Sequence, residues 1–132
     1  MKLDRFEYIS NEGLSNEWRL DECKLSQINL IVGKNARGKS RIVKAIYNIS
    51  EILLSKKVRS IVTGKAVWRL YFDEAMPDDR TVYILQSNQG VVIQEKLLKG
   101  NQELLTRDES GIGEIWAEQL HIHMKLFRPL KS

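Results

Sequence analysis

The stretch VGKNARGKSR occupies residues 32–41, between a nearly apolar run at 27–32 and a segment with helical periodicity. Within it, Gly33 to Ser40 follow the pattern Gly-x-x-x-x-Gly-Lys-Ser, which is typical of phosphate-binding loops when a strand precedes it and a helix follows. The sequence meets both conditions, because 27–32 suits a strand buried on both faces. We therefore predict a nucleotide site on a strand–loop–helix unit.

Each residue type in this loop has a physical role. The two glycines let backbone N–H groups point inward around an anion, and the helix that follows adds its unsatisfied N–H groups and positive dipole end. Lys39 is the predicted catalytic residue, which reaches the β- and γ-phosphates, and the Ser40 hydroxyl is the predicted Mg²⁺ ligand. The predicted nucleotide-binding set is Gly33, Lys34, Asn35, Ala36, Arg37, Gly38, Lys39, Ser40 and Arg41.

Length and composition indicate an ordinary globular chain. Its 132 residues suit one domain or one lobe of a larger domain, and 29% of them are charged. No apolar run approaches the roughly 18 residues of a membrane span, and the N-terminus resembles no export signal. A single cysteine, Cys23, predicts no disulfide and suits a reducing cytoplasm. The net charge of +4 favours polyanionic partners such as nucleotides or nucleic acid.

The first part of the chain predicts short strands and one helix. KLDRFEYI (2–9) alternates like a strand, with Leu3, Phe6 and either Tyr8 or Ile9 in the core. WRL (18–20) predicts a second short strand. After the loop, an apolar residue recurs at helical spacing and predicts an amphipathic helix of about four turns. Its predicted buried face consists of Ile42, Ile46, Ile49 and Leu53.

The second part predicts an antiparallel meander. Apolar runs at 66–74 and 80–87 flank a turn around Pro77, which indicates a hairpin. NQG (88–90) and KGNQ (99–102) predict turns into two further strands. The tail at 114–127 fits a helix through Trp116, Leu120 and Phe127, and fits a strand through LHIHMKL (120–126).

Two further stretches are partly similar to sequence motifs of ATPases. RLYFDE (69–74) ends in two acids, as a Walker B strand does, but Arg69 interrupts the apolar run and the Pro77 turn follows. We interpret Asp73 and Glu74 as acids at the end of an ordinary strand. SGIGE (110–114) resembles the Ser-Gly-Gly-Glu signature of ABC-type ATPases with an inserted Ile112, and we interpret it as a glycine turn.

The other candidate functional residues are supported by weaker sequence patterns. His121 and His123 would share a face on a strand, but no third metal ligand follows at suitable spacing. No histidine or acid pattern makes Cys23 a nucleophile. Gln86 and Gln119 are equal candidates for a Mg²⁺-linking glutamine, and each is better explained as a surface residue.

The longer segment INLIVGKNARGKSRIVKAI (28–46) resembles the N-terminal lobe of ABC-class AAA ATPases of the SMC-like, RecF-like and OLD-like group. VVIQEKLLKGNQELLTRDESGIGEI (91–115) is similar to a β-rich insert in these proteins. The resemblance implies an α/β fold: lobe I of an ABC-type P-loop NTPase head, with an antiparallel β-rich segment after the helix. Residues 1–132 would then form the N-terminal part of one ATP-binding domain, with strands, loop and helix in 1–57 and the meander and tail in 58–132.

The resemblance also implies a mechanism. Two heads would form a homodimer around ATP and Mg²⁺, and hydrolysis would be coupled to DNA repair or anti-phage defence. DNA, or a nuclease or toxin effector, would be the partner, and no membrane is implied. In this family Arg37 stands at a position that is usually small.

The family's signature, Walker B acids and switch histidine have no convincing counterpart up to Ser132. We therefore expect the chain to be the first half of a head, which binds nucleotide but needs further polypeptide for hydrolysis. The alternative is a self-contained, non-hydrolytic nucleotide-binding switch or interaction module. A small-molecule kinase is disfavoured because the meander supplies neither a parallel sheet nor a lid.

Overall fold

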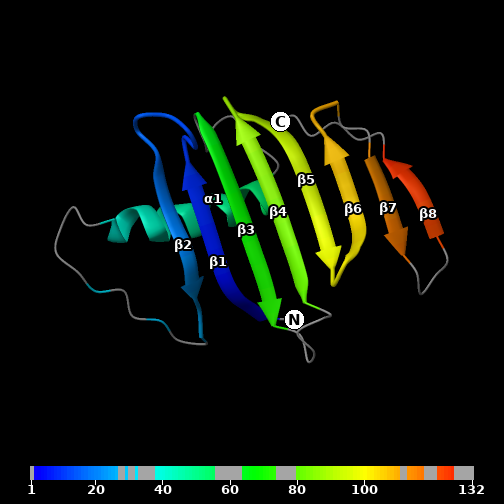
Figure 1. Cartoon of the computed structure of the whole chain (residues 1–132), viewed down its shortest axis with the longest axis horizontal. Coiled ribbons are helices and arrows are strands. Elements are labelled where there is room, and N and C mark those ends of the chain that lie inside the picture. Colours follow the sequence, from blue (N-terminus) through cyan, green and yellow to red (C-terminus); the bar gives the residue numbers. More distant parts are fainter. Residues whose placement is uncertain are drawn as a thin grey trace.

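The computed structural model is an eight-stranded sheet with one helix packed on it (Figure 1). It describes residues 2–26, 29, 32, 38–55, 64–73, 80–110, 113–117 and 122–126. The strand order is β2-β1-β3-β4-β5-β6-β7-β8. The elements are β1 (Lys2–Ser10), β2 (Trp18–Lys24), α1 (Lys39–Ser55), β3 (Lys65–Asp73), β4 (Thr81–Asn88), β5 (Val91–Lys99), β6 (Gln102–Asp108), β7 (Gly113–Ala117) and β8 (Ile122–Leu126).

The predicted α/β P-loop fold of an ABC-type head is wrong. Every pair of neighbouring strands is antiparallel, and α1 is the one helix in the described part of the chain. A strand–helix–strand unit of an α/β fold needs two parallel strands joined through the helix. Here the strand that follows α1 is β3, which pairs antiparallel with β1. The fold prediction was wrong because it rested on a resemblance that is centred on one loop, whereas most of the described strands form antiparallel hairpins.

The antiparallel meander predicted for the second part is confirmed. Strands β3 to β8 follow one another across the sheet in chain order. The β4–β5 turn has positive φ at Gln89 (50°) and Gly90 (77°), as a two-residue hairpin turn requires. Gly100 has φ 59° in the next turn. The tail, for which helix and strand were both open, contains the two short strands β7 and β8. The turn around Pro77 lies outside the described residues.

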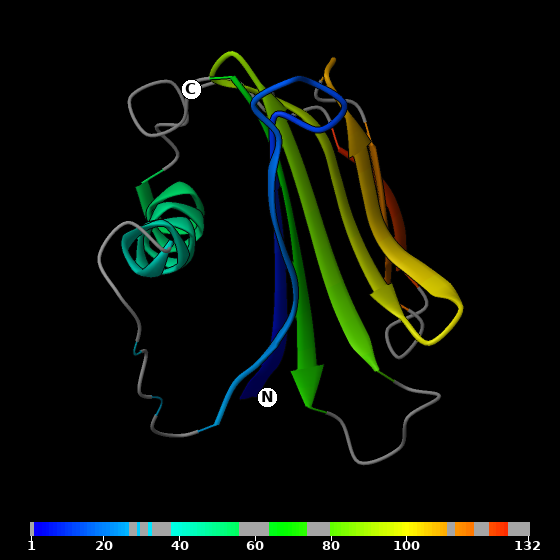
Figure 2. The same cartoon turned by 60° about the vertical axis from the view of Figure 1, so that its left-hand side comes forward.

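The core lies between one face of the sheet and α1 (Figure 2). Because side chains alternate along a strand, Ala66, Trp68 and Leu70 of β3 share the face that α1 covers. Phe6 of β1 is buried in this core, as the sequence predicts, and Tyr8 packs against it partly buried. Ile9, the alternative to Tyr8, is buried on the opposite face, where it pairs with Val67. The central cluster comprises Phe6, Ala45, Ile49, Ile52, Ala66, Trp68, Leu70, Leu85 and Val92.

The buried side of α1 differs in part from the predicted one. Ala45, Ile49 and Ile52 are buried, and Ile46 packs partly buried against the cluster. Leu53 is 50% exposed, so its assignment to the core face is wrong. The most buried stripe runs through Ala45, Ile49 and Ile52, and at 100° per residue Leu53 falls at its margin.

The predicted strand at 27–32 is not found where the structure describes this segment. Asn29 and Val32 belong to no strand, and residues 27, 28, 30 and 31 lie outside the described part. The Asn29 side chain accepts a hydrogen bond from the Ser26 backbone N–H at 2.8 Å and donates to the Ser26 carbonyl oxygen at 2.9 Å. The Asn29 side chain is thus bonded to the backbone of Ser26.

Candidate phosphate-binding site

The candidate site is built at the N-terminus of α1. Gly38 has φ +91°, a backbone conformation that side chains other than glycine rarely adopt. Its carbonyl oxygen accepts the first helical hydrogen bond, from the Ile42 N–H at 3.0 Å. The first turn contains Lys39 and Arg41 and no acidic residue. The N–H groups of a first helical turn have no partner within the helix, and together with the helix dipole and these two cations they favour an anion here.

Two predicted site residues share an open surface hollow. Lys39 and Ser40 line it together with Val43, Lys44 and Tyr47, and its volume is about 510 Å³. Lys39 is half-buried and Ser40 is exposed, so the Ser40 hydroxyl is accessible to a ligand. None of the described residues that line the hollow carries a carboxylate.

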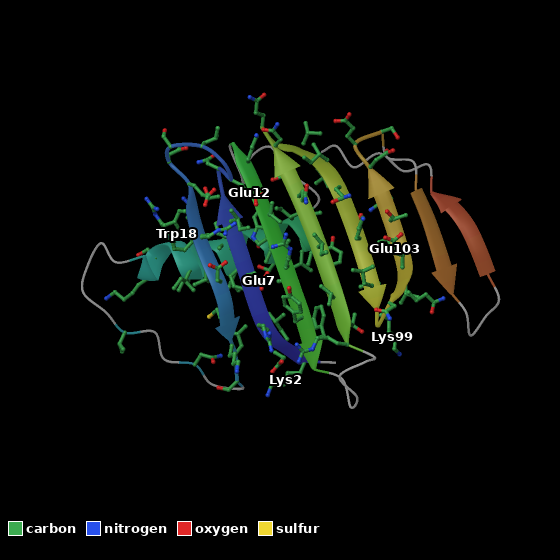
Figure 3. The ribbon with its side chains drawn as sticks, viewed as in Figure 1. Lys2, Glu7, Glu12, Trp18, Lys99 and Glu103 are labelled. Atoms are coloured by element: carbon green, nitrogen blue, oxygen red, sulfur yellow. The ribbon has the colours of Figure 1, made fainter. Side chains whose placement is uncertain are left out.

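Arg41 lies elsewhere, against the edge of the sheet. Its guanidinium carbon is 5.6 Å from the ring centroid of Trp18, and it does not line the hollow with Lys39 and Ser40. Figure 3 shows Trp18 at the start of β2, beside the N-terminal end of α1. The predicted nucleotide-binding residues therefore divide between two sides of the first helical turn.

An aromatic chain connects this end of α1 to the core. The Trp18 and Tyr8 ring centroids are 6.0 Å apart, and those of Tyr8 and Trp68 are 5.3 Å apart. The Trp68 indole N–H donates to the Ala45 carbonyl oxygen at 3.1 Å. Burial raises the pKa of Tyr8, against the smaller lowering effects of a hydrogen bond with Ser10 and the charge of Arg41. The first two turns of α1 thus rest on packed rings.

The predicted site is described only in part. Gly38, Lys39, Ser40 and Arg41 are described, whereas residues 33–37, which include the first glycine and the rim residues, lie outside the described part.

The position of Asp73 argues against a Walker B role. Trp18, which contacts Gly38, pairs with Ser10, and Ser10 pairs with Ala66. Asp73 is the last residue of β3, seven residues from Ala66, which is about 23 Å along a strand. Its backbone position is therefore far from Ser40, as expected of an acid at the end of an ordinary strand. Glu74 lies outside the described residues.

The other candidate residues that the structure describes lie in β4, β7 and β8, away from the hollow at Lys39 and Ser40. Gly113 and Glu114 of the SGIGE stretch begin β7, whereas an ABC signature opens a helix. Gln86 pairs with Val67, the neighbour of Trp68, so it lies on the sheet face opposite α1. His123 is in β8, and His121 lies outside the described residues. Among the residues that the structure describes, no three His, Cys, Asp or Glu side chains gather as a metal site.

Sequence patterns missed Trp18. The sequence predicts Trp18 only as part of a short strand. Nothing in the sequence pattern indicates that this strand contacts the phosphate loop. A glycine at position 38 is the one local signal, since a Cβ there would lie 3.3 Å from the Trp18 ring.

Comparison with protein-family models finds no match, and neither do comparisons with curated proteins and with solved structures. Within the described residues, no helix combines the length and the apolar character needed to cross a membrane.

Proposed function

We propose that this chain binds ATP together with Mg²⁺ at the loop from Gly33 to Ser40. The observation that carries the proposal is that the Gly-x-x-x-x-Gly-Lys-Ser pattern ends where α1 begins, with Lys39 and Ser40 side by side at an open helix N-terminus. Binding at this loop does not require the fold of an ABC-type head, because backbone N–H groups and the two side chains make the contacts.

Each described residue has a definite part in binding. The Lys39 ammonium would neutralise phosphate charge, and the Ser40 hydroxyl would hold Mg²⁺, which would reduce the negative charge of the phosphates. Gly38 adopts the positive φ of +91° that brings the backbone into the start of α1, and its lack of a side chain leaves room for the Trp18 ring.

Binding without turnover is the expected behaviour of the chain by itself. ATP hydrolysis needs an acid to hold Mg²⁺ and a group to orient water. The described residues that line the hollow at Lys39 and Ser40 include no carboxylate, and the backbone of Asp73 is distant along its strand. Hydrolysis, and any coupling to DNA or to a nuclease or toxin, would follow only where a second copy or another polypeptide supplies these groups.

Titration calorimetry of MgATP tests the proposal, with Lys39→Ala as the disruptive variant and Lys44→Ala as the matched control. Both lysines line the hollow, but only Lys39 occupies the position of the phosphate-binding lysine. A charged hydrogen bond contributes about 1.5–3 kcal/mol, so Lys39→Ala should weaken binding roughly 10- to 100-fold. Lys44→Ala should change the affinity by less than about threefold, as a screened surface charge does.

Two results would contradict the proposal. One is an unchanged MgATP affinity in Lys39→Ala. The other is an equal loss in both lysine variants, which would indicate general attraction of an anion to a basic surface. Ser40→Ala provides an internal check, because it should remove the Mg²⁺ dependence of binding and leave metal-free ATP binding in place.

A further inference from the structure

Trp18 contacts both the end of the phosphate loop and the first turn of α1. Its ring lies against Gly38, where a Cβ would stand 3.3 Å from Cζ2, and the Arg41 guanidinium lies over the same ring at 5.6 Å from its centroid. One side chain from β2 therefore holds two residues of the predicted nucleotide site. This contact is separate from the hollow at Lys39 and Ser40.

The contact between Trp18 and Gly38 joins the start of β2 to the residue that precedes α1. Trp18 is the first residue of β2, and the chain leaves β2 after Lys24. The departing end is fixed by the Leu25 N–H, which donates to the Asp4 carbonyl oxygen at 2.8 Å. The returning end is fixed at Gly38, against the strand from which the segment departed. The start of α1 is therefore held against β2 in the folded protein before any ligand binds.

Trp18 is itself held from behind. Tyr8 of β1 contacts it on one side and contacts Trp68 on the other, and Trp68 is fully buried and bonded to α1. Aromatic pairs at these centroid distances are stabilising beyond the effect of the area they bury. The ring therefore has a rigid support, as a residue that positions others requires.

We propose that Trp18 is a positioning residue for the nucleotide site: it holds Gly38 and Arg41 so that the end of the phosphate loop is set before ligand binds. The inference rests on the proposed ATP site and adds to it the residue that preorganises it. Trp18 makes no contact with ligand in this role. It acts through Gly38, whose carbonyl starts the helix, and through Arg41, which adds positive charge beside the helix N-terminus.

The test compares Trp18→Ala, Trp18→Phe and Leu14→Ala by MgATP calorimetry, with thermal unfolding measured alongside. Phe keeps a ring against Gly38 and under Arg41, so it should bind within about threefold of the wild type, whereas Ala should bind about 10-fold more weakly. Leu14 is 50% exposed in the loop before β2, so its truncation should leave the affinity unchanged. Rescue by Phe separates positioning by the ring from the loss of any other contact.

Trp18 also provides a spectroscopic readout. MgATP should change the tryptophan emission of the wild type, and Trp18→Phe should abolish that change while Trp68 and Trp116 remain. Wild-type affinity in Trp18→Ala, or an emission change that persists in Trp18→Phe, would overturn the positioning role and leave the ATP site standing. Absence of MgATP binding in the wild type would overturn both. If Trp18→Ala does not fold, Trp18→Phe with its emission measurement and Arg41→Gln, expected to bind about threefold more weakly, decide the question.

Discussion

The indole N–H of Trp68 on β3 donates a hydrogen bond to the carbonyl oxygen of Ala45 on α1, with N and O 3.1 Å apart. The Trp68 side chain is fully buried, and Ala45 is 2% exposed. This bond joins the helix that carries the predicted nucleotide site to the third strand of the sheet.

Trp68→Phe should therefore lower the free energy of unfolding by roughly 2 kcal/mol, from one lost hydrogen bond and a small cavity. Urea denaturation followed by circular dichroism measures it. Tyr71→Phe is the control, because the Tyr71 hydroxyl donates to Glu7 at 3.2 Å in a partly buried position and its loss should cost about 0.5 kcal/mol. A Trp68→Phe variant as stable as Tyr71→Phe would show that the Trp68–Ala45 bond stabilises little.

Local features of this fold were predictable from the sequence. The turn at Gln89 and Gly90 forms because these two consecutive residues adopt positive φ. A turn of this kind pairs the strands on either side of it, which are β4 and β5. The start of α1 was predictable too, because Gly38 and Lys39 belong to a sequence pattern that a helix typically follows. Hairpins and helix ends are specified by a few consecutive residues, so a single sequence displays them.

The order of the sheet was not predictable in the same way. β1 pairs with β3 across more than fifty intervening residues, with Glu7 opposite Arg69, and no periodicity within either strand encodes that partner. The contact between Trp18 and Gly38 is non-local in the same sense. The family resemblance supplied an incorrect fold because it rested mainly on residues around one loop and carried no information on the pairing of distant strands.

The outer face of α1 yields a second prediction. Val43, Tyr47 and Leu54 are 55%, 58% and 79% exposed, and they lie on the side of the helix away from the sheet. Val43→Ser should change the free energy of unfolding by less than about 0.5 kcal/mol, as exposed substitutions generally do. Ile49→Ala, on the buried face at 4% exposure, should cost about 2–5 kcal/mol.

Chemical denaturation measures the free energy of unfolding of the Val43→Ser and Ile49→Ala variants. It is repeated at several protein concentrations, because stability that rises with concentration would indicate association between copies. Stability that is independent of concentration, with a large effect only for Ile49→Ala, is the expected result. A loss above about 1.5 kcal/mol in Val43→Ser would show that the outer face of α1 is covered in solution.

A buried ion pair on β5 and β6 yields a third prediction. Glu95 and Arg107 have side chains 12% and 15% exposed, and the Arg107 Nε–H donates to Glu95 Oε2 at 2.9 Å. The Tyr83 hydroxyl donates to Glu95 Oε1 at 2.7 Å. Burial, and then the charge and hydrogen bond of Glu95, raise the pKa of Tyr83 well above its usual 10, so the phenol remains a donor across the physiological range.

Arg107→Met leaves Glu95 buried without its cation and should cost roughly 3–5 kcal/mol. The double variant Glu95→Leu with Arg107→Met removes both charges and should recover most of that loss. Urea unfolding of the single and double variants measures the difference. Equal stability of the single and double variants would contradict a buried pair and indicate that water reaches Glu95.

The turn after β6 yields a prediction about pH. Asp108 Oδ1 accepts hydrogen bonds from the Ser110 hydroxyl and from the Ser110 backbone N–H, the latter at 2.9 Å. These bonds favour the charged carboxylate, so they hold the pKa of Asp108 below its usual 3.8. Because the folded pKa is the lower one, the stabilisation is complete above the unfolded pKa and is lost as the pH falls through the folded value.

Ser110→Ala removes the hydroxyl donor, which is the larger of the two effects on Asp108. The carboxyl resonance of Asp108, followed by NMR from pH 6 to pH 2, should titrate below 3.8 in the wild type and move up towards 3.8 in the variant. Ser50→Ala is the matched control, since the Ser50 hydroxyl donates to the Tyr47 carbonyl oxygen within α1 and should leave the Asp108 titration unchanged. A midpoint at or above 3.8 in the wild type would mean that the Ser110 bonds do not persist in solution and that this turn is held by its backbone alone.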